Sequence, residues 1–336
     1  MGSFELWLRL KLTKGVGEIT LYRLYKTFGG AENILSADYK DLKGCVGESR
    51  ARAILSGDFD EKVYEEVLRA VESGSIYVIT LEDEEYPSAL KRIKDPPPLV
   101  FLRGSLRKLP LVGIVGTRKP TPYTLNFVEE LVSMAVSRGY GVVSGGAAGV
   151  DSKAHLSAVE NSGYTLCILG FGILKARGKV FESISESGGA LLSEFLPHER
   201  GDRHTFPKRN RLIAALSEFI VVPEAGGSSG SLITADHAVK QGKKVYAHIG
   251  IGRSSSWDGC YRLVREGKAE LIKDGSHVFG VKENSESEPL LEFLRIPRSL
   301  DDVKTFLGVD DSEALKLLTE LELEGKIKRL GSFFSS

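Results

Sequence analysis

The chain has 336 residues, of which 42% are hydrophobic and 27% are charged. This length suits two or three domains, and the composition excludes wholesale disorder and the fibrous classes. Lysine plus arginine equal aspartate plus glutamate at 45 each, so the net charge does not support a nucleic-acid partner. Any nucleic-acid site must therefore come from local charge.

The N-terminal segment and the cysteines exclude further classes. Residues Met1 to Leu6 have no basic start followed by an apolar run, and 18 consecutive apolar residues occur nowhere in the sequence. We therefore expect a cytoplasmic protein with no membrane contact. Cys45, Cys167 and Cys260 lack CxxC spacing, which predicts reduced, packed thiols. We expect neither a bound metal nor a cofactor.

Residues 1–75 are expected to form a small helical domain of the helix-hairpin-helix type. Two segments echo each other, residues 12–17 and residues 42–47, and each places a Gly-hydrophobic-Gly turn between helical patterns. Such a hairpin can offer turn amides to a phosphate. The alternative, a packing module that has only kept the turn geometry, remains open.

Residues 76–282 are expected to form the main domain. Ile76 to Thr80 reads as a short strand, and the proline run after Asp95 then makes residues 95–104 a connector into this domain. From Leu111 onward, apolar runs alternate with amphipathic helical patterns. This alternation predicts an α/β fold with an extended Rossmann-like, doubly wound and mainly parallel sheet. The expected strands are residues 111–115, 140–143, 166–169, 190–192, 219–222 and 244–247.

The C-terminal part is expected to be a separate small domain. The polar residues that begin at Glu283 indicate a linker over residues 283–294. Beyond it, residues 295–336 read as two helices followed by a hairpin around Gly331, a winged-helix-like pattern. Such a domain can read DNA or serve as a dimer or protein contact, and the sequence leaves both open.

Three loops rich in glycine or serine follow predicted strands, at residues 113–118, 144–151 and 223–231. In open α/β sheets, ligands bind beyond the carboxyl ends of the strands, where helix N-termini present unpaired amides. Arg118 follows a buried strand and can make charge-assisted bonds to phosphate, although it can also be an ordinary surface residue. The loops together predict a phosphate site.

A basic segment, residues 198–211, supplies local charge, although it can also be a solvated loop. We find no HExxH motif, no Walker lysine and no paired acid and base, so an enzyme is not expected. Asp151 is expected to cap a helix, Glu224 to hold loop amides or basic side chains, and His155 to be packed or at the surface.

Together these motifs resemble the DNA-processing protein A (DprA/Smf) family, over about two thirds of the chain from Tyr86 through Ile272. The Phe-Pro-x-Arg-Asn-Arg and Ser-Gly-Ser-Leu-x-Thr-Ala segments are the most specific. One departure is residues 173–181, where the family has a Tyr-Pro loop and where Lys175, Arg177 and Lys179 can supply charge instead. The matching segments are Tyr86-Pro87, Asp95-Pro96-Pro97, Arg103-Gly104, Gly116-Thr117-Arg118, Ser144-Gly145-Gly146-Ala147, Gly149-Val150-Asp151, Phe206-Pro207-Lys208-Arg209-Asn210-Arg211 and residues 229–235.

The resemblance implies a protein that binds single-stranded DNA, dimerises and helps to load RecA recombinase in natural transformation or recombination. It also implies a phosphate groove, in which Phe206 and Asn210 meet a base or ribose or only shape the loop. The rival is a nucleoside-monophosphate phosphoribohydrolase of a related fold, which needs a glutamate and an arginine at the glycosidic bond. The expected nucleic-acid-binding residues are Gly116, Thr117, Arg118, Ser144, Gly145, Gly146, Ala147, Phe206, Lys208, Arg209, Asn210, Arg211, Ser229 and Gly230.

Overall fold

The computed structural model describes residues 2–250, 254–280, 287–323 and 325–335. The chain forms two compact units, Met1–Phe279 and Gly280–Ser336. Each unit is described by itself.

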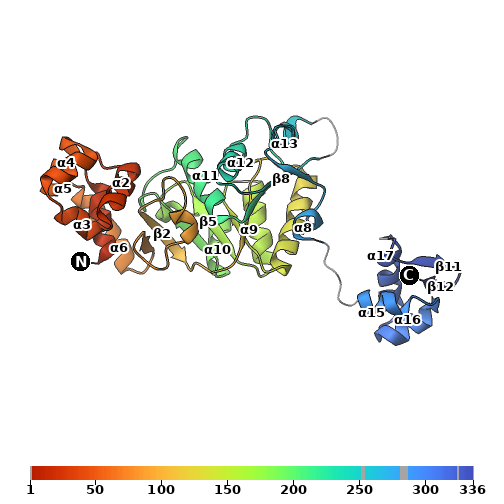
Figure 1. Cartoon of the computed structure of the whole chain (residues 1–336). Coiled ribbons are helices and arrows are strands. Elements are labelled where there is room, and N and C mark those ends of the chain that lie inside the picture. The colour runs from red at the N-terminus through yellow and green to blue at the C-terminus, as the bar shows by residue number, and fades with distance from the viewer. Residues whose placement is uncertain (1, 251–253, 281–286, 324, 336) are drawn as a thin grey trace. The chain divides into compact units, whose positions relative to one another are not determined.

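The first unit is built on a nine-stranded sheet with the order β1-β2-β6-β5-β4-β3-β7-β8-β9 (Figure 1). The seven strands from β6 to β9 in this order pair in parallel. The predicted doubly wound, mainly parallel sheet is therefore confirmed. The strands are β1 (Tyr77–Thr80), β2 (Leu99–Gly104), β3 (Leu111–Ile114), β4 (Gly141–Ser144), β5 (Thr165–Leu169), β6 (Ala190–Ser193), β7 (Phe219–Val222), β8 (Val245–His248) and β9 (Glu270–Ile272).

Helices cover both faces of this sheet, so the central strands are buried throughout and read as continuous apolar runs. Helices α8 (Pro122–Ser137) and α9 (Val150–Glu160) pack on one face, where Val112 and Val142 contribute to the core. Helices α11 (Thr205–Leu216), α12 (Ser231–Lys240) and α13 (Asp258–Arg265) pack on the other. Shorter elements are α7 (Ser88–Lys91), η1 (Ile173–Lys175), α10 (Lys179–Glu186), η2 (Ser255–Trp257) and α14 (Ser276–Phe279).

The predicted connector over residues 95–104 is wrong, because Leu99–Gly104 is strand β2 of the sheet. It pairs antiparallel with both β1 and β6. The prolines before it break regular structure as expected, but Leu99 to Leu102 are then buried between the sheet's covering layers. Strand β9 was not predicted, since two of its three residues are exposed and little apolar pattern remains.

The N-terminal region is helical, as predicted, and the first Gly-hydrophobic-Gly turn lies between α1 and α2. The second predicted turn is wrong, because Gly44 to Val46 belong to α4 and Gly47 alone separates α4 from α5. The helices of this region do not form an independent core, however. Trp7 and Leu21 belong to the same buried cluster as Leu99, Phe101 and Leu169 of the sheet. The helices are α1 (Ser3–Leu12), α2 (Glu18–Phe28), α3 (Ala31–Ser36), α4 (Tyr39–Val46), α5 (Glu48–Ser56) and α6 (Glu61–Glu72).

The second unit has its own core, formed by residues such as Leu290, Val303, Leu318 and Phe334. Its strands pair in the order β10-β12-β11, all antiparallel. The helices and the hairpin lie where the sequence predicts them, and the winged-helix-like assignment stays a prediction. The elements are α15 (Ser287–Phe293), β10 (Arg298–Ser299), α16 (Leu300–Leu307), α17 (Asp311–Leu323), β11 (Lys328–Leu330) and β12 (Phe333–Ser335).

The predicted linker over residues 283–294 is too long. Helix α15 lies inside it, and Leu290 and Leu294 are buried in the core of the second unit. The linker was predicted from the polar residues that begin at Glu283, and the prediction gave these two leucines no weight. Residues 283–286 lie outside the described part of the chain. Within the described part, no helix is long and apolar enough to cross a bilayer.

Candidate functional site

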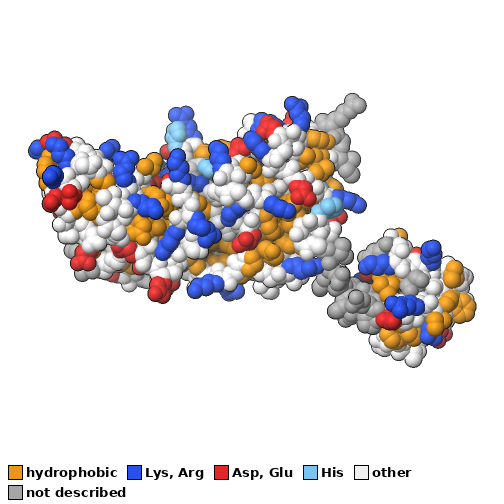
Figure 2. Space-filling view, in the orientation of Figure 1, with side chains coloured by type: hydrophobic (Ala, Val, Ile, Leu, Met, Phe, Trp, Pro, Cys, Tyr) orange, Lys and Arg blue, Asp and Glu red, His pale blue; other side chains and the backbone are white. Residues whose placement is uncertain are grey.

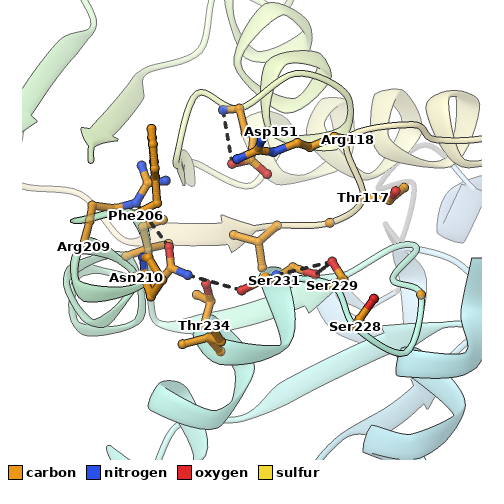
Figure 3. A pocket seen from close by; sticks show the side chains of 18 of the residues that line it. Thr117, Arg118, Asp151, Phe206, Arg209, Asn210, Ser228, Ser229, Ser231 and Thr234 are labelled. Atoms are coloured by element: carbon orange, nitrogen blue, oxygen red, sulfur yellow. Dashed lines mark hydrogen bonds between the residues drawn. The ribbon is translucent and has the colours of Figure 1, made fainter. Parts of the chain in front are cut away.

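The sheet has its topological switch point at β3. The chain passes from β3 to β4 on one side and later returns to β7 on the other side. Ligands bind at such points, outside the carboxyl ends of the strands. A cavity of about 490 Å³ lies here, lined by the loops after β3 and β7 and by the first turns of α11 and α12 (Figure 3).

Many of the predicted site residues line this cavity, which we call the strand-end pocket. Residues that the prediction missed also line it, namely Asp151, Arg203, Ser228, Ser231 and Thr234. Arg203 lies in the basic segment, and the hydroxyl residues lie in or directly after the third loop, so both signals were present in the sequence. The predicted residues in the lining are Gly116, Thr117, Arg118, Ala147, Phe206, Arg209, Asn210, Ser229 and Gly230.

The first and third loops are tied together by residue Glu224. Its Oε2 accepts hydrogen bonds from the backbone amide and the hydroxyl of Thr121, at 2.9 and 3.0 Å. Its backbone carbonyl accepts a bond from the amide of Thr117 at 2.8 Å. Glu224 is buried and holds a loop amide, as predicted. This bracing leaves the side chain of Arg118 exposed at the pocket.

The second loop is held by Asp151. Gly149 is the N-cap of α9, so Asp151 lies inside the first turn rather than at the predicted cap. Its Oδ2 accepts bonds from the amides of Gly145 and Ala147, at 3.2 and 3.5 Å. Burial raises the pKa of Asp151, and the charge of Arg209 acts in the opposite direction. His155 is packed, with Nδ1 2.7 Å from the hydroxyl of Thr165.

Arg209 is buried at the base of the pocket and joins two strand ends. Its Nη1 donates to the carbonyls of Gly145 and Ile168, and its Nε donates to Oδ1 of Asn210 at 3.2 Å. Burial lowers the pKa of this guanidinium. Asn210 in turn donates to the carbonyl of Gly230 at 3.3 Å. Arg209 therefore organises the loops, and its donors are largely used within the protein.

The glycines of the first two loops allow other parts of the chain to approach the loop backbone closely. A Cβ at Gly145 would lie 2.5 Å from Nη2 of Arg209, and one at Gly146 would lie 2.7 Å from Sγ of Cys167. A Cβ at Gly116 would lie 2.9 Å from the carbonyl oxygen of Glu224. Around Gly230, by contrast, space is open. Only the third loop combines glycine with room for a ligand backbone to approach.

Five of the predicted site residues are absent from the pocket lining: Gly145 and Gly146, whose close contacts are given above, and Ser144, Lys208 and Arg211. Ser144 is buried, and its hydroxyl donates to the carbonyl of Ile114 at 2.6 Å. Lys208 pairs with Glu18 and Glu194. Arg211 pairs with Asp95 at 2.9 Å and with Glu194 at 2.7 Å. Lys208 and Arg211 therefore lie outside the pocket that Arg118 lines, and a groove that includes all three cations stays a prediction.

The helical period explains why these two residues lie outside the pocket. Successive residues of α11 are rotated by about 100°, so residues three or four apart share a face. Phe206, Arg209, Asn210 and Ile213 face the strand-end pocket. Lys208 and Arg211 are three apart and point elsewhere. The lysines and arginine of residues 173–181 also lie outside the lining, so they do not replace the missing Tyr-Pro loop at this pocket.

Two exposed guanidiniums, Arg118 and Arg203, line the pocket. Figure 3 shows Arg118 in the same pocket as serine and threonine hydroxyls and the partly exposed ring of Phe206. Elsewhere on the visible face, Lys and Arg side chains are dispersed among acidic ones rather than gathered into one stripe (Figure 2). The fold and pocket define a Rossmann-like protein with a strand-end site of the kind that takes phosphate-bearing ligands.

The chain belongs to the DNA recombination-mediator protein A family, whose model matches residues 77–281. This confirms the family resemblance, and the description is that of a mediator rather than a catalyst. The DNA processing protein DprA of Streptococcus pneumoniae is 32% identical over 77% of this chain and 93% of that protein. Protein Smf of Escherichia coli is 31% identical over 80% of this chain and 79% of that protein.

Two solved structures of the family are similar. DprA from Streptococcus pneumoniae has a TM-score of 0.72 and 27% identity, covering 84% of this chain and 98% of that one. DNA processing protein A from Helicobacter pylori, whose structure addresses its single-stranded DNA binding mode, has a TM-score of 0.54 and 29% identity. That match covers 64% of this chain and 96% of the Helicobacter protein.

Proposed function

We propose that this protein binds single-stranded DNA in the strand-end pocket and acts in homologous recombination or natural transformation. Loading of RecA, homodimerisation and a cytoplasmic location are parts of the same proposal. The observation that carries it is the pair of exposed guanidiniums, Arg118 and Arg203, beside the hydroxyl-rich third loop at the switch point. The family's description and the Helicobacter pylori relative support it.

The groups in the pocket favour a single strand read through its backbone. Guanidiniums, hydroxyls and loop amides contact phosphate, which carries no base information. The ring of Phe206 is held edge-on to Phe171, with centroids 6.2 Å apart, and lines the pocket. Unpaired bases stack on such rings with little sequence preference. We therefore expect a preference for single-stranded over duplex DNA across sequences.

Nucleotide hydrolysis has less support. A phosphoribohydrolase needs a glutamate at the glycosidic bond, but Glu224 is buried, and its Oε2 is used by Thr121. The carboxylate that lines the pocket, Asp151, accepts loop amides. Incubation with a nucleoside monophosphate should therefore release no free base.

The test is the salt dependence of oligothymidylate binding by two neighbouring variants. Arg118→Ala should weaken binding and make the log–log salt slope shallower by about 0.7, the share of one phosphate contact on a single strand. Lys119→Ala is the matched control, since Lys119 is also exposed but lies outside the pocket lining. A folded Arg118→Ala protein with unchanged affinity and slope would contradict the proposal.

A further inference from the structure

A second cavity, of about 560 Å³, lies on the other side of α11 from the residues that face the strand-end pocket. It is formed by the C-terminal halves of α11 and α12 and by the segment that follows α7. We call it the α11–α12 pocket. The residues that matter for its chemistry are Arg92, Lys94, Asp95, Arg211, Lys240 and Gln241.

Two buried polar atoms in the wall of this pocket lack hydrogen-bond partners within the described part of the chain. Arg211 is 5% exposed, and Asp95 and Glu194 use its Nε and Nη2, which leaves Nη1 without an acceptor. Gln241 donates from Nε2 to the carbonyl of Arg211 at 3.2 Å, which leaves its Oε1 without a donor. Unsatisfied buried groups are rare in folded proteins and indicate water or a ligand.

The charge around these atoms is positive. Arg92, Lys94 and Lys240 are exposed cations at the rim. Asp95 is the carboxylate in the lining, and its Oδ2 is already bound to Nε of Arg211. The amine of Lys243 donates to the carbonyls of Ala215 and Ser217 at the C-terminal end of α11, so it is already used within the protein.

Histidine 237 also lines the pocket, and its environment agrees with this charge balance. Burial lowers the pKa of His237, and the charges of Lys240 and Arg211 lower it further, whereas Asp95 and Asp236 raise it. Because a neutral imidazole adds no charge, the positive charge of the neighbouring cations favours a bound anion.

We propose that the α11–α12 pocket binds a nucleotide. Its phosphate would contact Arg211 and the rim cations, and a base or ribose donor would contact Oε1 of Gln241. A nucleotide carries both the acceptor that Nη1 of Arg211 lacks and the donor that Oε1 of Gln241 lacks. The volume lies within the usual range for small-molecule sites, about 300–1,000 Å³.

The nucleotide has two possible sources, a free nucleotide or a residue of a DNA strand that continues from the strand-end pocket. The second source rests on the proposed function. Helix α12 contributes Ser231 and Thr234 to the strand-end pocket, and its His237 and Lys240, with the C-cap residue Gln241, line the second. At about 1.5 Å per residue, Ser231 and Gln241 are separated by roughly 15 Å along the helix, a span that a few nucleotides can cover.

The experiment compares Arg92→Glu and Lys240→Glu with the control Lys62→Glu, an exposed lysine of α6 outside both pockets. Each folded variant is titrated with dAMP, with a short oligothymidylate and with a long one. We expect both pocket variants to lose affinity by about threefold or more for dAMP or for the long oligomer, the effect of a partly exposed ion pair. The control should be unchanged.

The pattern of losses identifies the source. Weaker dAMP binding with unchanged oligomer binding indicates a free nucleotide, and a loss confined to the long oligomer indicates a continuing strand. Unchanged affinity of both pocket variants for all three probes would overturn the inference. So would dAMP binding that depends on Arg118 but not on Lys240. Failure of the proposed function is a separate result, because it is measured with Arg118→Ala and the dAMP titration does not require strand binding.

Discussion

Two glycines of the pocket loops differ in the space that is available for a side chain. Gly149 has a φ of +86°, and a Cβ there would overlap the carbonyl oxygen of Thr117. Gly230 has a φ of −63° and no atom within 4 Å of an added Cβ. We expect Gly149→Ala to lower the free energy of unfolding by about 2 kcal/mol or more, because backbone strain and the clash add.

The matched substitution Gly230→Ala should leave the free energy of unfolding within about 0.5 kcal/mol of the original and should affect DNA binding instead. Urea unfolding and oligothymidylate titration of both variants test this pair. Equal losses of stability would mean that the loops adapt to a side chain at Gly149, contrary to the packing described above.

His155 should make stability depend on pH. Burial lowers its pKa to about 3, and the charge of Arg209 adds to this effect. In the unfolded chain this imidazole has its ordinary pKa of 6.5, so below that pH the unfolded chain binds more protons than the folded chain. Stability should therefore fall as the pH drops from about 6.5 toward 3, by at most about 1.4 kcal/mol per pH unit.

Urea midpoints between pH 7 and pH 4 measure this dependence. His155→Gln keeps a polar group beside Thr165 and should flatten the curve in that window. An equally steep decline in the variant would assign the acid sensitivity to other groups.

The roles of single residues were predicted unevenly from the sequence. Glu224 holds a loop amide as expected, because an acid directly after a buried strand meets the amides of neighbouring loops. Arg209 was expected to bind phosphate, but it is buried and donates to the carbonyls of Gly145 and Ile168. Gly145 follows β4 and Ile168 lies in β5, and no local pattern reveals that both carbonyls converge on a side chain of α11.

At the scale of secondary structure, α11 carries two sets of contacts on its two faces. The face with Phe206 and Asn210 lines the strand-end pocket, and the face with Lys208 contacts Glu18 of α2. Burial alone would raise the pKa of Glu18, but Lys11 and Lys208 together lower it to about 2. Burial raises the pKa of the neighbouring Glu194 to about 7. Lys208 therefore joins the N-terminal helices to the sheet.

We expect Lys208→Ala to lower the free energy of unfolding by about 1 kcal/mol at neutral pH, a modest value because the lysine is partly exposed. The salt slope of single-strand binding should not change, since Lys208 lies outside the strand-end pocket. A shallower salt slope with unchanged stability would instead show that Lys208 contacts a DNA phosphate, as the sequence predicted.

The elements themselves were more predictable than the faces they present. Strands β3 to β8 appear as predicted because buried parallel strands leave continuous apolar runs. The phase of α11 was not predicted, because basic residues occur on both of its faces and only tertiary contacts distinguish them. Strand β2 was taken for a connector because the proline run before it resembles the end of a domain.

At the scale of the whole molecule, the two ends of the chain differ in their dependence on the sheet. The C-terminal unit buries Leu290, Val303 and Leu318 in a core of its own. The N-terminal helices bury Trp7 and Leu21 against Leu99 and Phe101 of the sheet. The positions of both sets of apolar residues can be read from the sequence, but the residues they pack against cannot. The sequence therefore predicts an independent domain at each end, with boundaries at residues 75 and 283.

This difference predicts which fragments fold. A fragment from Leu99 to Lys282 holds all three loops and the basic segment, so the sequence alone predicts that it binds a single strand. In the structure, that cut removes β1 and all the N-terminal helices. It exposes Phe101 and Leu169, which are fully buried in the chain, and it removes Glu18 from Lys208. We expect this fragment to be unfolded or aggregated, since a large apolar patch is left without cover.

A fragment comprising Met1–Phe279 should behave differently, because it keeps the shared core and loses only a unit with a core of its own. We expect it to unfold cooperatively at the temperature of the corresponding transition in the full chain and to keep most of the single-strand affinity. Calorimetry and oligothymidylate titration of both fragments beside the full chain test this. A stable Leu99–Lys282 fragment with full affinity would show that the N-terminal helices are needed neither for folding of the sheet nor for DNA binding. A folded Met1–Phe279 fragment without binding would move the DNA site to the C-terminal unit.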